Sequence, residues 1–306
     1  MGKSVSIVVP SYQGENRLPL LLQALENQQT DCDWEVIVVL DGSTDGSEAI
    51  LAEWAEKIPL KYSARKQNLG RSATLNEGFK LATKDVLVRC DDDLVPDSKY
   101  IQIYSQTITE NPKTGAVGLP NNVFKNTKYS KVYGEPVDKR YAREAYASNQ
   151  EDRWHYWGGN CGVSREAFQE VGEYDTNFRE YGWEDVDWGY RLSKLGYGIA
   201  LVPGLEVPHN AASTTTATRC ERARWSGSAS VRFEKKHGVV KVEPQKTLWN
   251  TLVKILSRIA GKELGRFVDL LLWIVPARVG LRLADMTIQA SHRRGVSDAR
   301  SSLLSK

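Results

Sequence analysis

Three carboxylates stand within four residues of one another, at Glu184, Asp185 and Asp187, and Trp183 and Trp188 flank them. The apolar residues that follow recur at helical spacing, which places the acidic group in the first turn of a helix. There the exposed backbone amides and the helix dipole favour the ionised carboxylate. A carboxylate held in this way can act as a general base. Acidic residues also occupy the first turn of helices that do no chemistry, so this segment alone leaves both interpretations open.

A second acidic group, Asp91, Asp92 and Asp93, directly follows the apolar stretch 85–90. Like charges so close together repel one another, and a divalent cation with oxygen ligands would offset them. A solvated acidic turn is the simpler alternative. His209 follows a short apolar strand and can complete a shell of carboxylates and imidazole around such a cation, although a lone histidine is more often structural.

The elements that must position these groups alternate between strands and helices. Apolar runs predict strands over 4–10, 34–40, 85–90, 115–119 and 199–202, and helical spacing predicts helices over 15–29, around 50–54, around 75–82 and over 165–171, the last capped by Ser164. This order is typical of an α/β fold with a parallel sheet and right-handed crossovers, in which ligands bind at the carboxyl ends of the strands. Residues 121–157 are polar, aromatic and weakly periodic, which fits either a binding loop or a packed irregular segment.

Length and composition indicate an ordinary globular protein. The 306 residues are 41% hydrophobic and 26% charged, enough for one large α/β domain or two smaller ones. The start of the sequence shows no signal-peptide pattern. The four cysteines are scattered without metal or redox spacing, which favours reduced thiols in the cytoplasm.

Charge is distributed unevenly along the chain. Residues 219–306 carry 18 Lys and Arg against seven Asp and Glu, whereas residues 1–218 carry 23 against 31. A basic region on an acidic body suggests an anionic partner: a membrane, an anionic polymer or, less favoured, nucleic acid. Residues 249–294 predict two or three helices, and the apolar run 267–281 is too short and interrupted to span a bilayer. Basic residues flank its apolar positions, as in an interfacial helix, but a helical subdomain packed on the catalytic core or on a second copy of the chain is an equal alternative.

Five motifs, taken in order, resemble those of the family 2 inverting glycosyltransferases with the GT-A fold. They are Val8–Tyr12, Val38–Asp45 with its Asp41-Gly42-Ser43, Asn68-Leu69-Gly70, the DxD-like Asp91-Asp92-Asp93, and Gly158-Gly159-Asn160 through Trp183-Glu184-Asp185, which is similar to galactosyltransferase-like catalytic domains. The resemblance covers residues 4–210. It implies a Rossmann-like, mostly parallel sheet flanked by helices, with a mainly helical C-terminal extension.

The resemblance also implies domains and a nucleotide-sugar site. The catalytic domain would be 1–218, with a nucleotide-binding half 1–120 and an acceptor half 121–218, followed by the basic region 219–306. The implied nucleotide-sugar-binding residues are Pro10, Ser11, Tyr12, Asp41, Asn68, Arg71, Asp91, Asp92, Gly158 and Gly159, with Trp157 also bordering the donor sugar. Asp41 would contact the base, usually uracil. The sequence departs from the family pattern at two positions. Leu40 stands where the family has the first aspartate of a pair, and Leu75 stands where many members have an arginine. Arg71 would then make the diphosphate or base contact of that arginine.

Metal and catalytic residues are implied in the same way. Asp91, Asp93 and His209 would hold Mn²⁺ or Mg²⁺ against the diphosphate. Asp185 would be the general base, and Glu184 would bind sugar hydroxyls.

The leading hypothesis is therefore a metal-dependent inverting transferase that moves a sugar from a nucleotide donor, most simply a UDP-sugar, to a hydroxyl. The acceptor would be a glycan, a cell-wall polymer or a lipid-linked sugar, at the cytoplasmic side of a membrane, with no role for nucleic acid. The alternative is a non-catalytic carbohydrate- or polyanion-binding protein on a degenerate transferase scaffold, which only Leu40 and Leu75 support. A nucleotidyltransferase would need a glycine-rich phosphate loop near the N-terminus, and residues 10–14 are not one. The sequence predicts neither the donor sugar nor the oligomeric state.

Overall fold

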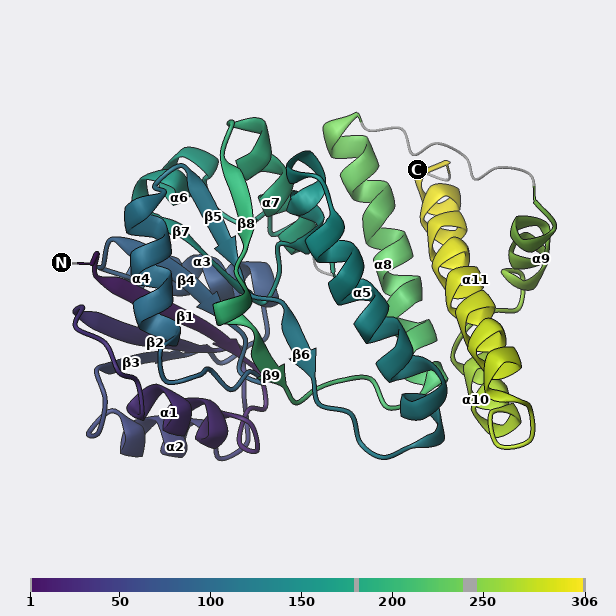
Figure 1. Ribbon diagram of the computed structural model, residues 1–306, viewed down its shortest axis with the longest axis horizontal. Coiled ribbons are helices and arrows are strands. Elements are labelled where there is room, and N and C mark those ends of the chain that lie inside the picture. Colours follow the sequence, from purple (N-terminus) through teal and green to yellow (C-terminus); the bar gives the residue numbers. More distant parts are fainter. Residues whose placement is uncertain (1, 179–181, 239–246, 305–306) are drawn as a thin grey trace. The chain divides into compact units, whose positions relative to one another are not determined.

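The computed structural model describes residues 2–178, 182–238 and 247–304, which form two compact units (Figure 1). Unit 1 comprises Met1–Val123, Ala142–Arg179 and Glu184–Ala211, and unit 2 comprises Phe124–Tyr141, Glu180–Trp183 and Ala212–Lys306. Residues 179–181, shortly before the acidic group at Glu184, and residues 239–246 of the basic region lie outside the described residues. The division that we predicted at residue 218 remains a prediction.

A seven-stranded sheet forms the centre of unit 1. Its strands are β1 (Val5–Ser11), β2 (Trp34–Leu40), β3 (Leu60–Ala64), β4 (Val86–Cys90), β5 (Thr114–Val117), β7 (Asn160–Ser164) and β8 (Gly198–Leu201). They lie in the order β3-β2-β1-β4-β7-β5-β8, and β7 pairs antiparallel with both of its neighbours. The apolar runs that predicted strands therefore do form a mostly parallel sheet, and they are almost continuously apolar because both faces of the sheet are covered.

Helices cover both faces of this sheet (Figure 1). They are α1 (Leu18–Glu26), α2 (Ser47–Trp54), α3 (Arg71–Leu81), α4 (Tyr100–Glu110), α6 (Arg165–Val171) and α7 (Glu184–Lys194). Apolar residues of α1, α2 and α4 join one core cluster with Ile7 and Val9, and those of α3, α6 and α7 join another with Val8. Alternate residues of β1 thus enter opposite cores, as the twofold period of a strand requires.

The predicted cap of α6 is confirmed, and a glycine follows the end of α7. The Ser164 hydroxyl accepts a hydrogen bond from the Ala167 amide at 3.1 Å and caps α6. Gly196 follows α7 with a φ of +83°, a conformation that glycine adopts without strain.

The segment 121–157 differs from both alternatives that we weighed for it. It contains the π-helix Ser130–Gly134, the helix α5 (Glu135–Ala147) and the 3₁₀-helix Gln150–Tyr156. Ala145 is the buried residue of α5, so the helix carries almost no apolar stripe for a sequence pattern to register.

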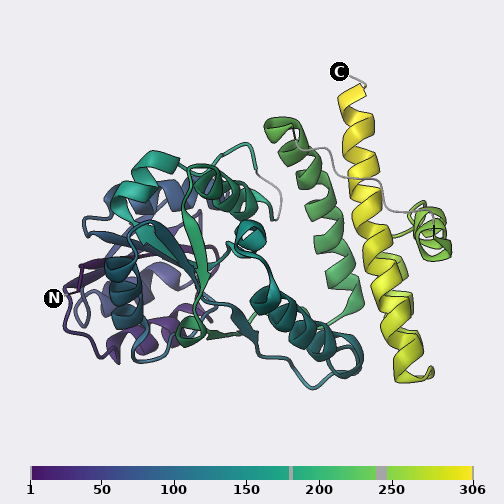
Figure 2. The same cartoon turned by 45° about the horizontal axis from the view of Figure 1, so that its top comes forward.

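Unit 2 is helical. Its long helices are α8 (Thr216–His237) and α11 (Ala277–Leu304), with α9 (Leu248–Leu256) and α10 (Lys262–Leu271) between them in the chain. Figure 2 shows α8, in green, beside α11, in yellow. A Cβ added to Gly227 or Gly295 would collide with backbone of the facing helix, so these glycines allow the two helices to approach closely. We predicted two or three helices over 249–294, and the structure has three, α9, α10 and α11. None of the described helices is long and apolar enough to cross a membrane.

Candidate active site

The loops after β1 and β2 hold each other at the carboxyl edge of the sheet. The Gln13 amide donates to the Ser43 hydroxyl at 3.0 Å, and the Gly14 amide donates to the Ser47 hydroxyl at 2.9 Å. Tyr12, predicted to line the nucleotide pocket, stands 51% exposed beside them, and Pro10 is partly buried at the end of β1. An aromatic ring held on a fixed loop in this way is available to a planar ligand.

Asp41 ties a third loop to the end of β2. Its carboxylate accepts from the Leu69 and Gly70 amides at 2.8 and 2.9 Å and from Arg65 at 3.3 Å. The side chain is almost fully buried by these contacts, whereas Asn68 of the same loop is exposed. Asp41 therefore orders the loop 65–70, and its predicted contact with a base remains a prediction.

Asp92 and Ser11, both predicted to bind the nucleotide sugar, form a hydrogen bond with each other. The Ser11 hydroxyl donates to Asp92 at 2.5 Å, and Arg17 donates to both oxygens of the same carboxylate at 2.9 Å. Burial raises the pKa of Asp92 in spite of these donors. Sequence reasoning missed Arg17, whose guanidinium offsets the charge of Asp92, the role that we had expected of a metal ion.

The least expected side chain of the site is Arg89, on the central strand β4. It is 1% exposed, and its Nε and Nη2 donate to the two oxygens of Asp91 at 2.9 and 3.2 Å. Its Nη1 pairs with Asp185 at the start of α7. A buried guanidinium thus joins the first aspartate of the DxD-like motif to the candidate base. The sequence does contain a signal for this pairing, a single arginine in the otherwise apolar run 86–90. A buried arginine needs a carboxylate partner.

Asp185 is the second residue of α7 and keeps 14% of its side chain exposed. Burial raises the pKa of Asp185 to about 7, although Arg89 acts to lower it. A carboxyl group that titrates near neutrality is well matched to proton abstraction at that pH. The helix N-terminus predicted for this group is confirmed.

Glu184, next to Asp185, is almost fully buried. Its Oε1 lies 3.4 Å from Arg71 Nη1, and its Oε2 is buried with no hydrogen-bond partner in the part of the chain that the structure describes. A buried carboxylate oxygen without a donor costs free energy unless a ligand hydroxyl satisfies it. Arg71 is itself half-exposed, so it presents a cation beside this open acceptor.

Asp93 and His209 lie together as predicted, with 3.3 Å between Oδ2 and Nε2. His209 belongs to β9 (Val207–His209), which pairs with β6 (Pro120–Asn122), and the Asn210 amide donates to the Asp93 carbonyl. Asn122 Oδ1 lies 2.6 Å from His209 Nδ1, a contact that orients the imidazole with its Nε2 toward Asp93. Sequence reasoning missed Asn122.

The predicted three-residue metal set stays a prediction, and the structure brings two of its three members together. Among the described residues, no three His, Cys, Asp or Glu side chains gather closely enough to hold a metal ion. Asp91 points to Arg89 instead, because the guanidinium occupies both of its oxygens.

The remaining pair still fits a divalent cation. Asp93 Oδ1 is buried and has no hydrogen-bond partner within the described ranges, and Asp93 Oδ2 and His209 Nε2 are close enough to hold one cation together. Mg²⁺ and Mn²⁺ commonly use one or two protein ligands together with phosphate oxygens and water.

Gly158 and Gly159 directly precede β7. Because β7 runs antiparallel to β4, its first residues lie at the carboxyl edge of the sheet, beside the end of β4. The Asp91 amide donates to the Gly159 carbonyl at 2.9 Å, and a Cβ on Gly159 would stand 2.5 Å from Asp91 Oδ2. Trp157, expected to border the donor sugar, is instead buried and stacked on Trp188 with ring centroids 5.0 Å apart. Trp157 therefore packs against α7 through Trp188.

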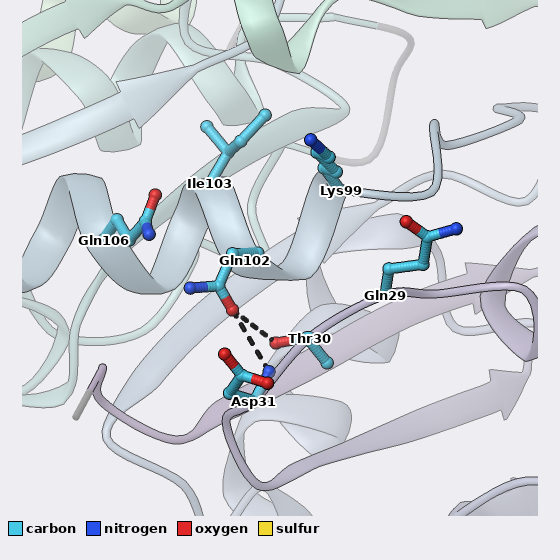
Figure 3. Close-up of a pocket in the computed structure, with 7 residues that line it drawn as sticks. All are labelled: Gln29, Thr30, Asp31, Lys99, Gln102, Ile103 and Gln106. Carbon is cyan, nitrogen blue, oxygen red and sulfur yellow. Dashed lines mark hydrogen bonds between the residues drawn. The ribbon is translucent and has the colours of Figure 1, made fainter.

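A polar hollow lies away from these loops, between α4 and the segment that precedes β2 (Figure 3). Gln102 Oε1 accepts from the Thr30 hydroxyl at 2.9 Å and from the Asp31 amide at 3.3 Å. Its lining contains none of the predicted site residues. All the candidate chemistry described above lies at the carboxyl edge of the sheet, within unit 1.

A mostly parallel sheet with a DxD-like loop and a helix-borne carboxylate at its carboxyl edge defines a GT-A glycosyltransferase fold, and solved structures share it. The mannosyltransferase PcManGT from Pyrobaculum calidifontis, in complex with GDP-Man and Mn²⁺, has a TM-score of 0.61 and 18% identity, over 96% of this chain and 87% of that one. TarS 1–349 from S. aureus has a TM-score of 0.55 and 16% identity, over 95% and 92%. At such identities the likeness shows the fold alone.

The sequence itself shows the family. The family model described as Glycosyl transferase family 2 matches residues 6–172, more than half of the chain, and one described as the N-terminal domain of galactosyltransferase matches 139–213. The chain belongs to glycosyl transferase family 2, which confirms the resemblance seen in its motifs.

Curated relatives share only part of their length with it. The hyaluronan synthase of Pasteurella multocida is 25% identical over 236 residues, which are 67% of this chain and 24% of the synthase. The chondroitin synthase of Escherichia coli is 24% identical over 237 residues, which are 67% of this chain and 34% of that synthase. The chain thus spans a quarter to a third of these relatives.

Proposed function

We propose that this protein transfers a sugar from a nucleotide diphosphate sugar to an acceptor hydroxyl by single displacement, with inversion at the anomeric carbon. The observation that carries the proposal is Asp185, a helix-borne carboxyl group with a pKa raised to about 7 by burial, at the same sheet edge as Asp93 and His209. Membership of glycosyl transferase family 2 supports the same reaction.

Donor binding is assigned to the loops after β1, β2 and β4. Tyr12 and the loop that Asp41 orders would receive the nucleoside, and Asp93 and His209 would hold Mn²⁺ or Mg²⁺. When bound, that ion supplies positive charge to the departing diphosphate. UDP is the proposed nucleotide. Solved neighbours carry either kind: PcManGT was solved with GDP-Man and GalNAc-T7 with UDP, GalNAc and Mn²⁺.

Asp185 would take the proton of the acceptor hydroxyl while that oxygen attacks the anomeric carbon. The bond from the anomeric carbon to the diphosphate oxygen breaks on the opposite face, so one displacement inverts the configuration. Glu184 Oε2 would accept a hydrogen bond from a sugar hydroxyl, since it is buried without a donor in the described residues. Arg71 beside it would meet the diphosphate or sugar.

The acceptor in this proposal is a sugar hydroxyl of a glycan, a cell-wall polymer or a lipid-linked precursor. Relatives named hyaluronan synthase and chondroitin synthase support a glycan acceptor. A cytoplasmic location is part of the proposal, and the four cysteines, all free thiols, agree with it.

The proposal is tested by nucleotide release from UDP-, GDP- and dTDP-sugars with Mn²⁺. We expect one donor to be turned over, with loss of turnover in EDTA and in Asp93→Ala. Asp185→Asn should keep donor binding and lose transfer by about 100-fold or more. Asp31→Asn, at an exposed aspartate away from the site, is the matched control and should be unchanged.

Near-normal turnover by Asp185→Asn would refute the base assignment. Absence of turnover and of any metal-dependent thermal shift with nucleotides would favour the alternative, a non-catalytic binding protein.

A further inference from the structure

Unit 2 exposes large apolar side chains along one face of α9. Leu248, Leu252, Ile255 and, just beyond the helix, Ile259 are between 42% and 78% exposed. Their spacing of four, three and four residues keeps them within one narrow stripe of the helix. The opposite side of α9 packs into the protein through Val253, so the stripe is the outer face.

The end of α10 and the turn after it repeat this arrangement. Phe267, Leu270, Trp273 and Ile274 are between 56% and 78% exposed, while Val268 and Leu272 enter the core of unit 2. We call these eight side chains, four along and just after α9 and four at the end of α10 and in the turn after it, the apolar face. So many large exposed apolar groups so close in the chain are unusual unless a partner covers them.

Basic residues lie close in the chain to the side chains of the apolar face. Lys254 and Arg258 lie on and just after α9, and Arg278 and Arg282 lie on the first turns of α11. All four are exposed, and none forms an ion pair with a residue in the ranges that the structure describes.

Acidic residues offer little to balance them. Residues 247–282 contain six Lys and Arg but two acidic residues, Glu263 and Asp269. Glu263 pairs with Arg266 at 2.6 Å, Glu221 of α8 pairs with Lys262 at 3.2 Å, and Asp269 accepts from the Thr216 and Ala217 amides, where it caps α8. The other four of the six basic residues, Lys254, Arg258, Arg278 and Arg282, therefore give the segment 247–282 a positive surface.

We propose that the apolar face binds the surface of an anionic lipid bilayer. Its Leu, Ile, Phe and Trp side chains would enter the boundary between headgroups and acyl chains, and the surrounding Lys and Arg would meet lipid phosphates. A second copy of this chain is the less favourable occupant, since a twofold contact would set basic rims against each other. This inference goes beyond the proposed transfer reaction and does not depend on it.

Vesicle co-sedimentation of the full chain tests the proposal. We expect binding to mixed phosphatidylcholine and phosphatidylglycerol vesicles, little binding to phosphatidylcholine alone, and weakening with salt. Lys254→Gln with Arg258→Gln should weaken binding about 25-fold, at roughly fivefold for each charge. Lys80→Gln with Lys113→Gln removes two exposed charges from unit 1 and should have little effect.

The apolar contribution is tested separately. Trp273→Gln with Ile274→Gln should weaken vesicle binding by at least about tenfold, because each side chain loses its burial in the interface. Leu20→Gln with Leu81→Gln is the matched control, at exposed positions of unit 1. Circular dichroism of each variant verifies that it is folded.

Three results would overturn the proposal. The first is equal binding by all variants, and the second is no binding to anionic vesicles. The third is a concentration-dependent dimer, seen without lipid and lost in Trp273→Gln with Ile274→Gln, which would assign the apolar face to a second copy of the chain.

Discussion

Arg89→Met removes the guanidinium that joins Asp91 to Asp185. Arg89 lies fully buried between the two carboxylates, and it opposes the burial that raises the pKa of Asp185 to about 7. An adjacent opposite charge lowers a carboxyl pKa by about 1 to 3. Without Arg89 the pKa of Asp185 should therefore rise to about 8 to 10.

The consequence is a shifted pH profile. At pH 7 the ionised fraction of Asp185 would fall from about one half to between about 9% and 0.1%, so transfer should slow by roughly fivefold to 500-fold. Because only the ionised carboxylate accepts a proton, the rate of the wild type should rise through about pH 7, and that of the variant only at higher pH. At high pH the two rates should approach each other.

Initial transfer rates between about pH 6 and pH 10 measure this effect. Arg89→Lys retains the charge but not the forked geometry, so its midpoint should lie close to that of the wild type. A thermal melt adds an independent readout, since leaving buried carboxylates unpaired costs about 3–5 kcal/mol. Adding Asp185→Asn to Arg89→Met should recover part of that loss. If Arg89→Met lost activity equally at every pH, with an unchanged midpoint, Arg89 would not control the ionisation of the base.

Three further predictions concern the site loops. Gly159→Ala places a Cβ 2.5 Å from Asp91 Oδ2 and should raise the donor KM at least about tenfold in steady-state assays; an unchanged KM would place Asp91 away from the donor. Gly42→Ala imposes a side chain at a φ of +75° beside loop backbone and should destabilise the fold by about 1–3 kcal/mol in thermal melts. An unaltered Tm would contradict the strain argument. Asn122→Ala removes the acceptor that orients His209 and should weaken Mn²⁺ affinity about 10- to 100-fold, read from metal-dependent thermal shifts. Equal affinity would mean that His209 is not a ligand.

The local elements of this fold were predictable because their signals are contiguous. The runs 4–10, 34–40 and 85–90 became buried strands, since a strand covered on both faces is mostly apolar. The loops after these strands share one edge because parallel strands end together, which is why the motif residues could be grouped before any coordinates. Helix α5 was missed, since with Ala145 as its buried residue it leaves no periodic pattern.

By itself the sequence determined the order of strands and helices, the family motifs and the position of Asp185 at a helix start, because each depends on neighbours in the chain. Tertiary structure alone decided which charges meet. Arg89 pairs with Asp185 96 positions away, Arg17 takes Asp92, and the pairing of β6 with β9 sets Asn122 beside His209. Such partners are selected by burial and distance in the folded state, where an unpaired charge is costly, and no spacing along the chain encodes that choice.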